Sequence, residues 1–192
     1  DLVRSRGLGD VYKRQALLTG LAGTCCFSAF VWGVRWHFES ADGMRRGMRG
    51  VSLLSLLGLA IFWWRLCVCP LFAWPVALGL FAAALALFRA AVRASRGARL
   101  HLAFDPRAPH CLLRRGPYRL VRHPFYLAYM LFWLGTALAA RGLVGWIVPV
   151  LLSALYVAAA RGEERRFDAS ALADAYAAYR TRAGMFWPLR RG

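Results

Sequence analysis

Five apolar runs divide the sequence, and short polar or arginine-rich segments separate them: 16–34, 50–64, 66–88, 123–140 and 142–160. A helix that crosses a bilayer needs about 20 apolar residues, because the hydrocarbon core is about 30 Å thick and each residue rises about 1.5 Å. Four runs come within a few residues of this length. The run 50–64 reaches it only if flanking arginines such as Arg65 extend their side chains to the interface. One such run could be the buried helix of a soluble protein, but five predict an all-α polytopic transmembrane bundle with about five spans.

The net charge of the chain has to be interpreted by its position. The 192 residues are 59% hydrophobic and carry a net charge of +17. A charge this positive could indicate nucleic-acid binding, but a soluble domain cannot bury so much apolar surface. The arginines are also spread over several loops and form no recognised nucleic-acid motif. We therefore expect membrane lipids as partners and no nucleic acid.

The arginines are shared unequally among the segments between the apolar runs. Residues 35–49 hold four arginines, 89–122 hold nine and 161–192 hold seven, whereas Arg65 and Arg141 stand alone in the other two joints. Arginine-rich loops stay on the cytoplasmic side of a membrane. Five spans then place the C-terminus in the cytoplasm. We expect the protein in the inner (plasma) membrane of a bacterium.

The first 15 residues differ in character from the rest of the chain. They contain Lys13, the only lysine, and they are polar and poor in alanine. This segment resembles translated vector sequence, so we expect 1–15 to be a non-native tail and exclude it from the fold. Without it the charge is still +15, from 22 arginines minus 7 acidic residues. The remainder divides into N-terminal spans with basic loops, 16–113, and a region that carries the candidate chemistry, 114–192.

The five cysteines indicate neither a metal site nor a disulfide framework. No pair of them has zinc-finger spacing with partnering histidines, and their number is odd. We expect small buried thiols and no bound metal.

Two polar segments flank the last pair of apolar runs. Residues 114–126 read RRGPYRLVRHPFY and precede the pair, and residues 161–167 read RGEERRF and follow it. Because a very short joint separates the two runs, they should pack as an antiparallel helical hairpin. A hairpin returns to the side that it left, so the two segments should meet at one membrane face. The side chains expected to come together there are Arg122, His123, Tyr126, Glu163 and Glu164.

This set of side chains suits a zwitterionic ligand. Two carboxylates can receive an ammonium group, and an arginine can bind a carboxylate in a bidentate way. Polar groups at a hydrocarbon boundary are costly and usually functional. Taken singly, Arg122 could be a positive-inside anchor, and the glutamates could pair with Arg165 and Arg166. Taken together, the two segments favour a functional site.

The motifs resemble those of a known family. GPYRLVRHPFY, a helical hairpin, RGEERRF and YAAYRTRAGMFWP together resemble the isoprenylcysteine carboxyl methyltransferase and phospholipid methyltransferase family of integral membrane enzymes, over residues 114–188. The first three runs carry no comparable signature. Many members have a Phe-Gly pair after the double Glu, whereas Phe167 is followed by Asp168 here. This difference changes the number of residues between the glutamate pair and Tyr176, Tyr179 and Arg182.

The resemblance implies a cofactor and a set of site residues. The cofactor is S-adenosylmethionine, and the residues that would bind it are Gly116, Tyr118, His123, Pro124, Tyr126, Glu163 and Glu164. Arg122, Glu164 and Arg182 would serve the reaction. Arg122 or Arg182 would orient an acceptor carboxylate, and Glu164 or His123 would take a proton from an acceptor amine. No metal is needed, because the sulfonium methyl group is already electrophilic.

Residues 168–182 predict an amphipathic cytoplasmic helix. Leu172, Tyr176 and Tyr179 lie on one face at helical spacing. That face could cover the site or dock on the membrane surface.

The expected function is methyl transfer to a lipid-like acceptor at the cytoplasmic face of the membrane. An isoprenylcysteine carboxylate and a phospholipid amine both fit as acceptors. Two alternatives are a sterol-reductase-like membrane enzyme that uses NADPH, and a non-catalytic basic scaffold that binds anionic lipid. The sequence leaves open the acceptor, the atom that is methylated and the oligomeric state.

Overall fold

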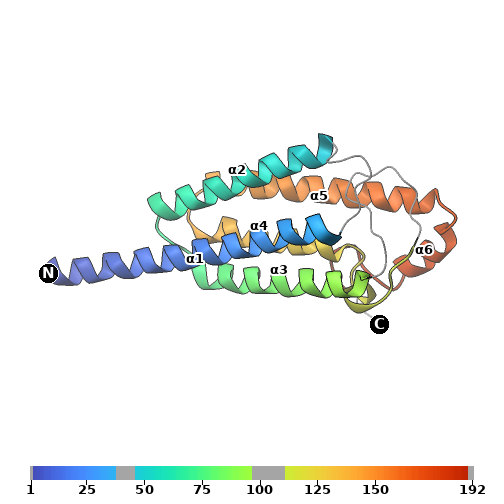
Figure 1. Cartoon of the computed structure of the whole chain (residues 1–192), viewed down its shortest axis with the longest axis horizontal. Helices are drawn as coiled ribbons and strands as arrows, with labels where there is room; N and C mark the ends of the chain where they lie inside the picture. Colours follow the sequence, from blue (N-terminus) through green and yellow to red (C-terminus); the bar gives the residue numbers. More distant parts are fainter. Residues whose placement is uncertain (1, 38–45, 97–110, 190–192) are drawn as a thin grey trace.

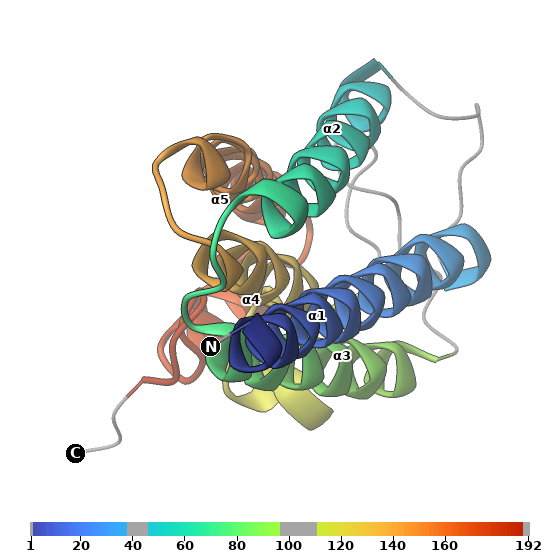
Figure 2. The same ribbon diagram turned by 90° about the vertical axis from the view of Figure 1, so that its left-hand side faces the viewer.

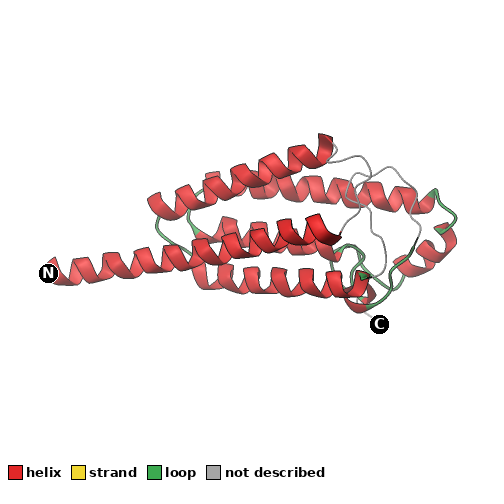
Figure 3. Cartoon of the chain, in the orientation of Figure 1, coloured by secondary structure: helices red, strands yellow, loops and turns green. Residues whose placement is uncertain are grey.

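The computed structural model describes residues 2–37, 46–96 and 111–189, and the basic loops 38–45 and 97–110 lie outside them. The described residues form helices and no strand (Figure 3). The elements are α1 (Leu2–His37), α2 (Arg46–Val68), α3 (Trp74–Ser95), the 3-10 helix η1 (Gly116–Arg119), α4 (Pro124–Ala139), α5 (Val144–Asp168) and α6 (Ala173–Arg180). The predicted all-α bundle is confirmed.

Within the described ranges, four helices are long and apolar enough to cross a membrane, and α4 is a shorter apolar helix. The four segments are Val11–Trp36, Gly47–Val68, Trp74–Ser95 and Val144–Asp168. The apolar run 50–64 lies inside α2, whose 23 residues include the flanking residues that were expected to complete this span, and the short apolar helix is α4, with 16 residues. Helix α4 lies in the middle of the bundle, where it packs mainly against α3 and α5 and also contacts α1 and α2 (Figure 2). A central helix about 24 Å long at ~1.5 Å per residue is covered by its neighbours along most of its length.

The joint between α2 and α3 corrects a predicted boundary. The apolar run 66–88 is not one helix, because α2 continues to Val68 and α3 begins at Trp74. The chain reverses between Cys69-Pro70 and Trp74-Pro75, where the prolines predict a turn. Pro70 explains the break, since proline has no N–H to continue a helix. The joint forms a backbone hydrogen bond to the end of α4, where the N–H of Phe72 donates to the carbonyl of Ala139 at 3.0 Å. Carbonyls in the last turn of a helix have no partner within the helix, so this bond satisfies one of them.

Arg65 in the last turn of α2 is buried, contrary to the expectation that it extends to the membrane interface. Its exposure is 5%. The guanidinium lies against the joint between α4 and α5 and the first turn of α5, where a Cβ on Gly145 would come within 2.9 Å of Nε. Gly142 in the same joint has a φ of 108°, which side chains rarely permit. The two glycines therefore let this joint close over the arginine.

The elements that carry the motifs gather at the opposite end of the bundle (Figure 1). Helices α4 and α5 form the predicted hairpin, and η1, the start of α4, the end of α5 and α6 lie together at that end. Helix α5 has 25 residues, about 37 Å at ~1.5 Å per residue, which exceeds a hydrocarbon core of about 30 Å. Glu163 and Glu164 therefore lie in the last turns of α5, beyond its apolar residues. The segment 161–167, which follows the last apolar run in the sequence, is a continuation of this helix.

Candidate active site

The first motif is held against the end of α3 by Gly116. This glycine has a φ of 57°, and a Cβ on it would lie 2.8 Å from the Cβ of Ala94. The neighbouring Arg115 donates from Nε to the carbonyl of Ala94 at 2.6 Å. Tyr118 in η1 is buried as a result, with 8% of its surface exposed. Gly116 thus shapes the loop through its backbone.

A short backbone pairing joins the first motif to the segment after α6. Val121 and Gly184 form a parallel bridge. The N–H of Arg122 donates to the carbonyl of Gly184 at 2.8 Å, and the N–H of Gly184 donates to the carbonyl of Leu120 at 3.1 Å. Pro124 then starts α4, at a position where the missing N–H costs no helical hydrogen bond. The backbone around Arg122 and His123 is therefore fixed from both sides.

Arg122 forms the centre of the polar cluster. Its Nε and Nη2 both lie 2.9 Å from Oε1 of Glu164, and its Nη1 donates to the carbonyl of Ala183 at 2.7 Å. Both charged side chains are 11% exposed. Charge-assisted hydrogen bonds of this kind are about twice as strong as neutral ones. All three guanidinium nitrogens of Arg122 are therefore engaged within the protein.

His123 and Tyr126 connect the first motif to both glutamates. The Nε2 of His123 lies 3.2 Å from Oε1 of Glu164, and its Nδ1 lies 3.5 Å from Oε2 of Glu163. The hydroxyl of Tyr126 donates to Oε1 of Glu163. Burial by itself would lower the pKa of His123, but hydrogen bonds and charge from the two glutamates outweigh it and raise that pKa above its ordinary value. The imidazole is therefore held toward its charged form, which donates from both nitrogens.

The carboxylates of Glu163 and Glu164 differ in their exposure to solvent and in the contacts that they already make. Glu163 is 29% exposed at its side chain and is contacted by Tyr126 and His123. Glu164 receives its three contacts at Oε1, and its Oε2 accepts no hydrogen bond from the residues that the structure describes. A carboxylate has about four acceptor positions. The pair therefore retains acceptor capacity for an ammonium group such as the one on the methionine part of S-adenosylmethionine.

Arg182 directly precedes Ala183, whose carbonyl accepts from Arg122, but the side chain of Arg182 does not join the cluster. It lies exposed in the turn that follows α6, and its side chain makes no hydrogen bond or ion pair to the described part of the chain. The structure thus brings together Arg122, His123, Tyr126, Glu163 and Glu164, with Gly116, Tyr118 and Pro124 shaping the backbone beside them. It does not bring Arg182 to them. In the described ranges, no group of three or more His, Cys, Asp or Glu side chains could hold a metal ion.

Helix α6 adds residues that we did not assign to the site from the sequence. Tyr176 and Tyr179 are 2% and 5% exposed, and they pack with Leu112 and Phe167. The hydroxyl of Tyr179 donates to the carbonyl of Tyr118 at 2.5 Å. Of the two possibilities for this face, covering the site or docking on the membrane, the packing favours the first. The helical spacing of the two tyrosines was the available signal.

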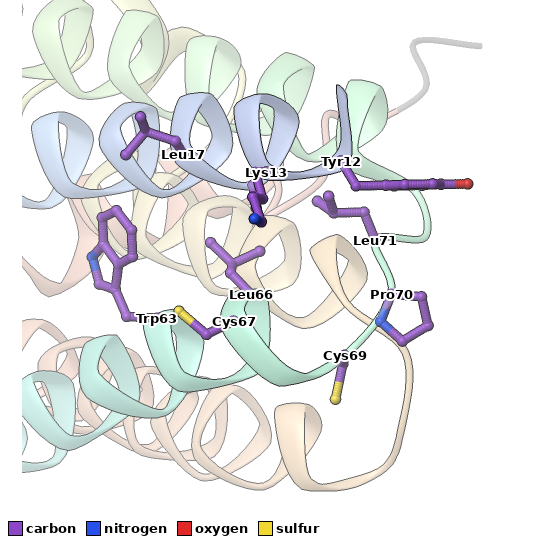
Figure 4. A pocket seen from close by; sticks show the side chains of 10 residues that line it. Tyr12, Lys13, Leu17, Trp63, Leu66, Cys67, Cys69, Pro70 and Leu71 are labelled. Carbon is purple, nitrogen blue, oxygen red and sulfur yellow. The ribbon is translucent and has the colours of Figure 1, made fainter. Parts of the chain in front are cut away.

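A cavity of about 550 Å³ lies far from this cluster, at the α2–α3 joint (Figure 4). Its lining is mostly apolar and comes from α1, α2 and the joint, with Trp63, Leu66 and Leu71 among the residues. Tyr12 and Lys13 also line it, and both belong to the segment expected to be non-native. It therefore plays no part in the assignment of the polar cluster.

The comparisons with known proteins identify a family. A model of the phospholipid methyltransferase family matches residues 74–175, more than half of the 192 residues. No curated protein and no solved structure matches the chain. The match begins with α3, whereas the resemblance in the sequence began only at residue 114. The family region therefore includes the third span, which carries no recognisable motif. It includes the polar cluster and ends before Tyr176 and Arg182.

Proposed function

The chain belongs to the phospholipid methyltransferase family, membrane enzymes that use S-adenosylmethionine, and we propose that it transfers a methyl group to a lipid-like acceptor at the cluster of Arg122, His123, Tyr126, Glu163 and Glu164. The observation that carries this assignment is the contact between the two motifs. Arg122 and His123, before the hairpin, lie 2.9 Å and 3.2 Å from the carboxylate of Glu164, after it.

Each residue of the cluster has a distinct proposed task. The bound cofactor supplies an electrophilic methyl group on a sulfonium. Glu163, the more open carboxylate, receives the ammonium group of the methionine part, while Tyr126 and His123 fix its orientation. Arg122 holds Glu164 in place and offsets its charge. Because Arg122 is engaged by Glu164 and Ala183, we assign it a positioning task and leave Arg182 as the exposed candidate for an acceptor carboxylate.

The location of the cluster supports an acceptor that enters from the bilayer. The cluster lies at the end of the bundle where the arginine-rich loops begin and end, and such loops stay cytoplasmic. A polar cofactor can then enter from the cytoplasm, while an amphiphilic acceptor enters sideways with its apolar part in the membrane. Alignment of the two reactants and exclusion of water are the contributions that the protein has to make. If the acceptor is an amine, Glu163 is the nearest open base for its proton.

Binding of S-adenosylhomocysteine tests this proposal against the reductase and scaffold alternatives. We expect the purified protein to be stabilised against thermal unfolding by S-adenosylhomocysteine and not by NADPH, because a ligand that binds only the folded state raises its stability. Stabilisation by NADPH alone would support the reductase. No response to either ligand would count for the scaffold.

An activity screen identifies the acceptor. The protein is incubated with methyl-labelled S-adenosylmethionine and, in separate reactions, a total lipid extract or prenylcysteine analogues. The mass of the labelled product then gives the acceptor and the methylated atom. Labelled product in the lipid extract supports a phospholipid acceptor, whereas label only in the prenylcysteine reactions indicates carboxyl methylation.

A further inference from the structure

Tyr176 of α6 carries a buried hydroxyl without a partner. The side chain is 2% exposed, and its hydroxyl forms no hydrogen bond to any residue that the structure describes. The ring itself is well packed: it stacks on Phe167 with 4.5 Å between ring centroids and an interplanar angle of 10°. A buried hydroxyl left unpaired destabilises a fold, and such groups in a native protein call for an explanation.

Tyr179, one turn further along the same helix, shows what docking of α6 requires. It is buried to a similar degree, and its hydroxyl donates to the carbonyl of Tyr118 at 2.5 Å. That bond ties α6 to the first motif. The hydroxyl of Tyr176 makes no comparable tie, so a phenylalanine at position 176 would pack equally well. The polar atom at Tyr176 therefore has a purpose other than docking the helix.

The surroundings of the Tyr176 hydroxyl point to Glu164. Phe167, on which the ring stacks, lies one turn after Glu164 on α5. Burial raises the pKa of Tyr176 above its ordinary value, and Glu164 raises it further through its negative charge and through the approach of its carboxylate to the hydroxyl, against the opposite effects of Arg122 and Arg180. The approach stops short of a hydrogen bond, since the hydroxyl has no partner within hydrogen-bond distance among the described residues. The carboxylate of Glu164 takes its three contacts at Oε1, so Oε2 is the acceptor without a donor among the described residues. A donor and an acceptor, both unpaired, thus lie close together beside the cluster.

We propose that Tyr176 is a positioning residue of the cofactor site, whose hydroxyl donates to Oε2 of Glu164 when the cofactor is bound. This inference rests on the proposed function. With Arg122 and His123 at one oxygen and Tyr176 at the other, the Glu164 carboxylate cannot rotate. The ammonium group of the cofactor then meets a fixed carboxylate pair. Tyr176 acts through Glu164 and need not touch the cofactor.

The test compares Tyr176→Phe with the matched variant Tyr179→Phe, from the same helix. For each protein, the midpoint of thermal unfolding without ligand and the Kd for S-adenosylhomocysteine are measured. We expect Tyr176→Phe to unfold at the same or a higher temperature than the wild type, because it removes an unpaired polar group. We expect its Kd to rise about tenfold, because the loss of one hydrogen bond to a charged group weakens binding by about this factor.

Steady-state kinetics separate positioning from a general loss of structure. Tyr176→Phe should raise the KM for S-adenosylmethionine with little change in kcat, since Glu164 belongs to the carboxylate pair that the ammonium group of the cofactor meets and does not react. Tyr179→Phe should lower the unfolding temperature, because it removes the hydrogen bond from its hydroxyl to the carbonyl of Tyr118.

The outcomes distinguish this inference from the proposed function. A wild-type protein that fails to bind S-adenosylhomocysteine refutes the proposed function, and the inference with it. A wild-type protein that binds, together with a Tyr176→Phe variant of equal affinity, refutes only the positioning role. A Tyr176→Phe variant that unfolds as early as Tyr179→Phe, or does not fold, shows that the hydroxyl is structural and also overturns the inference.

Discussion

Two arginines with little exposure to solvent lie at opposite ends of the same bundle, and their surroundings differ. Arg122, at the end that carries the motifs, directs three nitrogens to Glu164 and to the carbonyl of Ala183. Arg65, at the other end, is 5% exposed, and its Nη2 is buried without a hydrogen-bond partner among the described residues. Its guanidinium is covered by the glycine-containing joint between α4 and α5.

The difference shows that burial of a charge does not by itself indicate a functional site. A buried arginine without an anion carries a desolvation cost that nothing nearby offsets. A buried arginine within a set of two carboxylates and an imidazole is part of an arrangement that can hold a charged ligand. Only the end with Arg122 has such a set in the described residues. The predictions below test whether the two ends differ in this way.

The largest effect is expected for Glu164→Gln. Glutamine offers Arg122 and His123 one neutral carbonyl oxygen in place of their shared carboxylate, so both lose a negatively charged partner, and one of the two charges that face the cofactor is removed. We expect the affinity for S-adenosylhomocysteine to fall by about 10- to 100-fold, since a hydrogen bond to a charged group contributes about 1.5–3 kcal/mol, and we expect a loss of stability as well, because a buried ion pair is broken. Isothermal titration calorimetry measures the affinity. Membrane insertion, followed by fractionation, should be unchanged.

Replacing each arginine by methionine compares the two ends directly. Arg122→Met should destabilise the protein by about 3 kcal/mol and weaken cofactor binding, because Glu164 loses its partner. Arg65→Met should leave stability unchanged or raise it, since it removes an unpaired charge and keeps the packing. Thermal unfolding in detergent and binding of S-adenosylhomocysteine check both. If Arg65→Met lost cofactor binding as Arg122→Met does, the comparison would fail.

Gly145→Ala tests the cover over Arg65. The added Cβ would lie 2.9 Å from Nε of Arg65, so we expect a loss of about 1–2 kcal/mol in stability from overpacking. The loss should shrink when Arg65 is also replaced by alanine, because the clash is then gone. A double-mutant cycle of unfolding free energies measures this coupling. Additive effects would mean that the glycine is needed for another reason.

The smallest effect is a pH dependence carried by His123. The glutamates raise the pKa of this histidine in the folded protein above its ordinary value of about 6.5. Its contribution to stability is therefore complete below about pH 6.5 and is lost as the pH rises through the folded-state pKa. The difference in unfolding temperature between the wild type and His123→Gln should shrink over that range. A difference that grows with pH has the opposite sign and contradicts the charged imidazole.

The sequence predicted the polar cluster better than the ends of the helices. Arg122 and Glu164 are 42 positions apart, yet their meeting follows from a hairpin with a very short joint, since its ends return to one side. The break between α2 and α3 was harder to place, because the joint itself contains apolar residues such as Leu71 and Phe72. Hydropathy does not distinguish such a joint from the helices that it connects.

The burial of individual polar groups could not be predicted from the sequence either. The position of Arg65 predicts an interfacial side chain, and only the packing of α2 against the α4–α5 joint shows that it points inward. Tyr176 and Tyr179 have the same spacing signal, but one hydroxyl finds a carbonyl and the other does not. Such differences depend on where distant segments lie in three dimensions. Pattern alone does not contain that information.

The central claim is that methyl transfer depends on the cluster around Glu164, and one measurement tests it most directly. Wild-type protein, Glu164→Gln and Arg65→Met are incubated with methyl-labelled S-adenosylmethionine, total lipid extract and prenylcysteine analogues, and label in the extracted product is counted. We predict label transfer by the wild type and by Arg65→Met, and none by Glu164→Gln. Equal transfer by Glu164→Gln, or no transfer by the wild type to any acceptor, would contradict the claim.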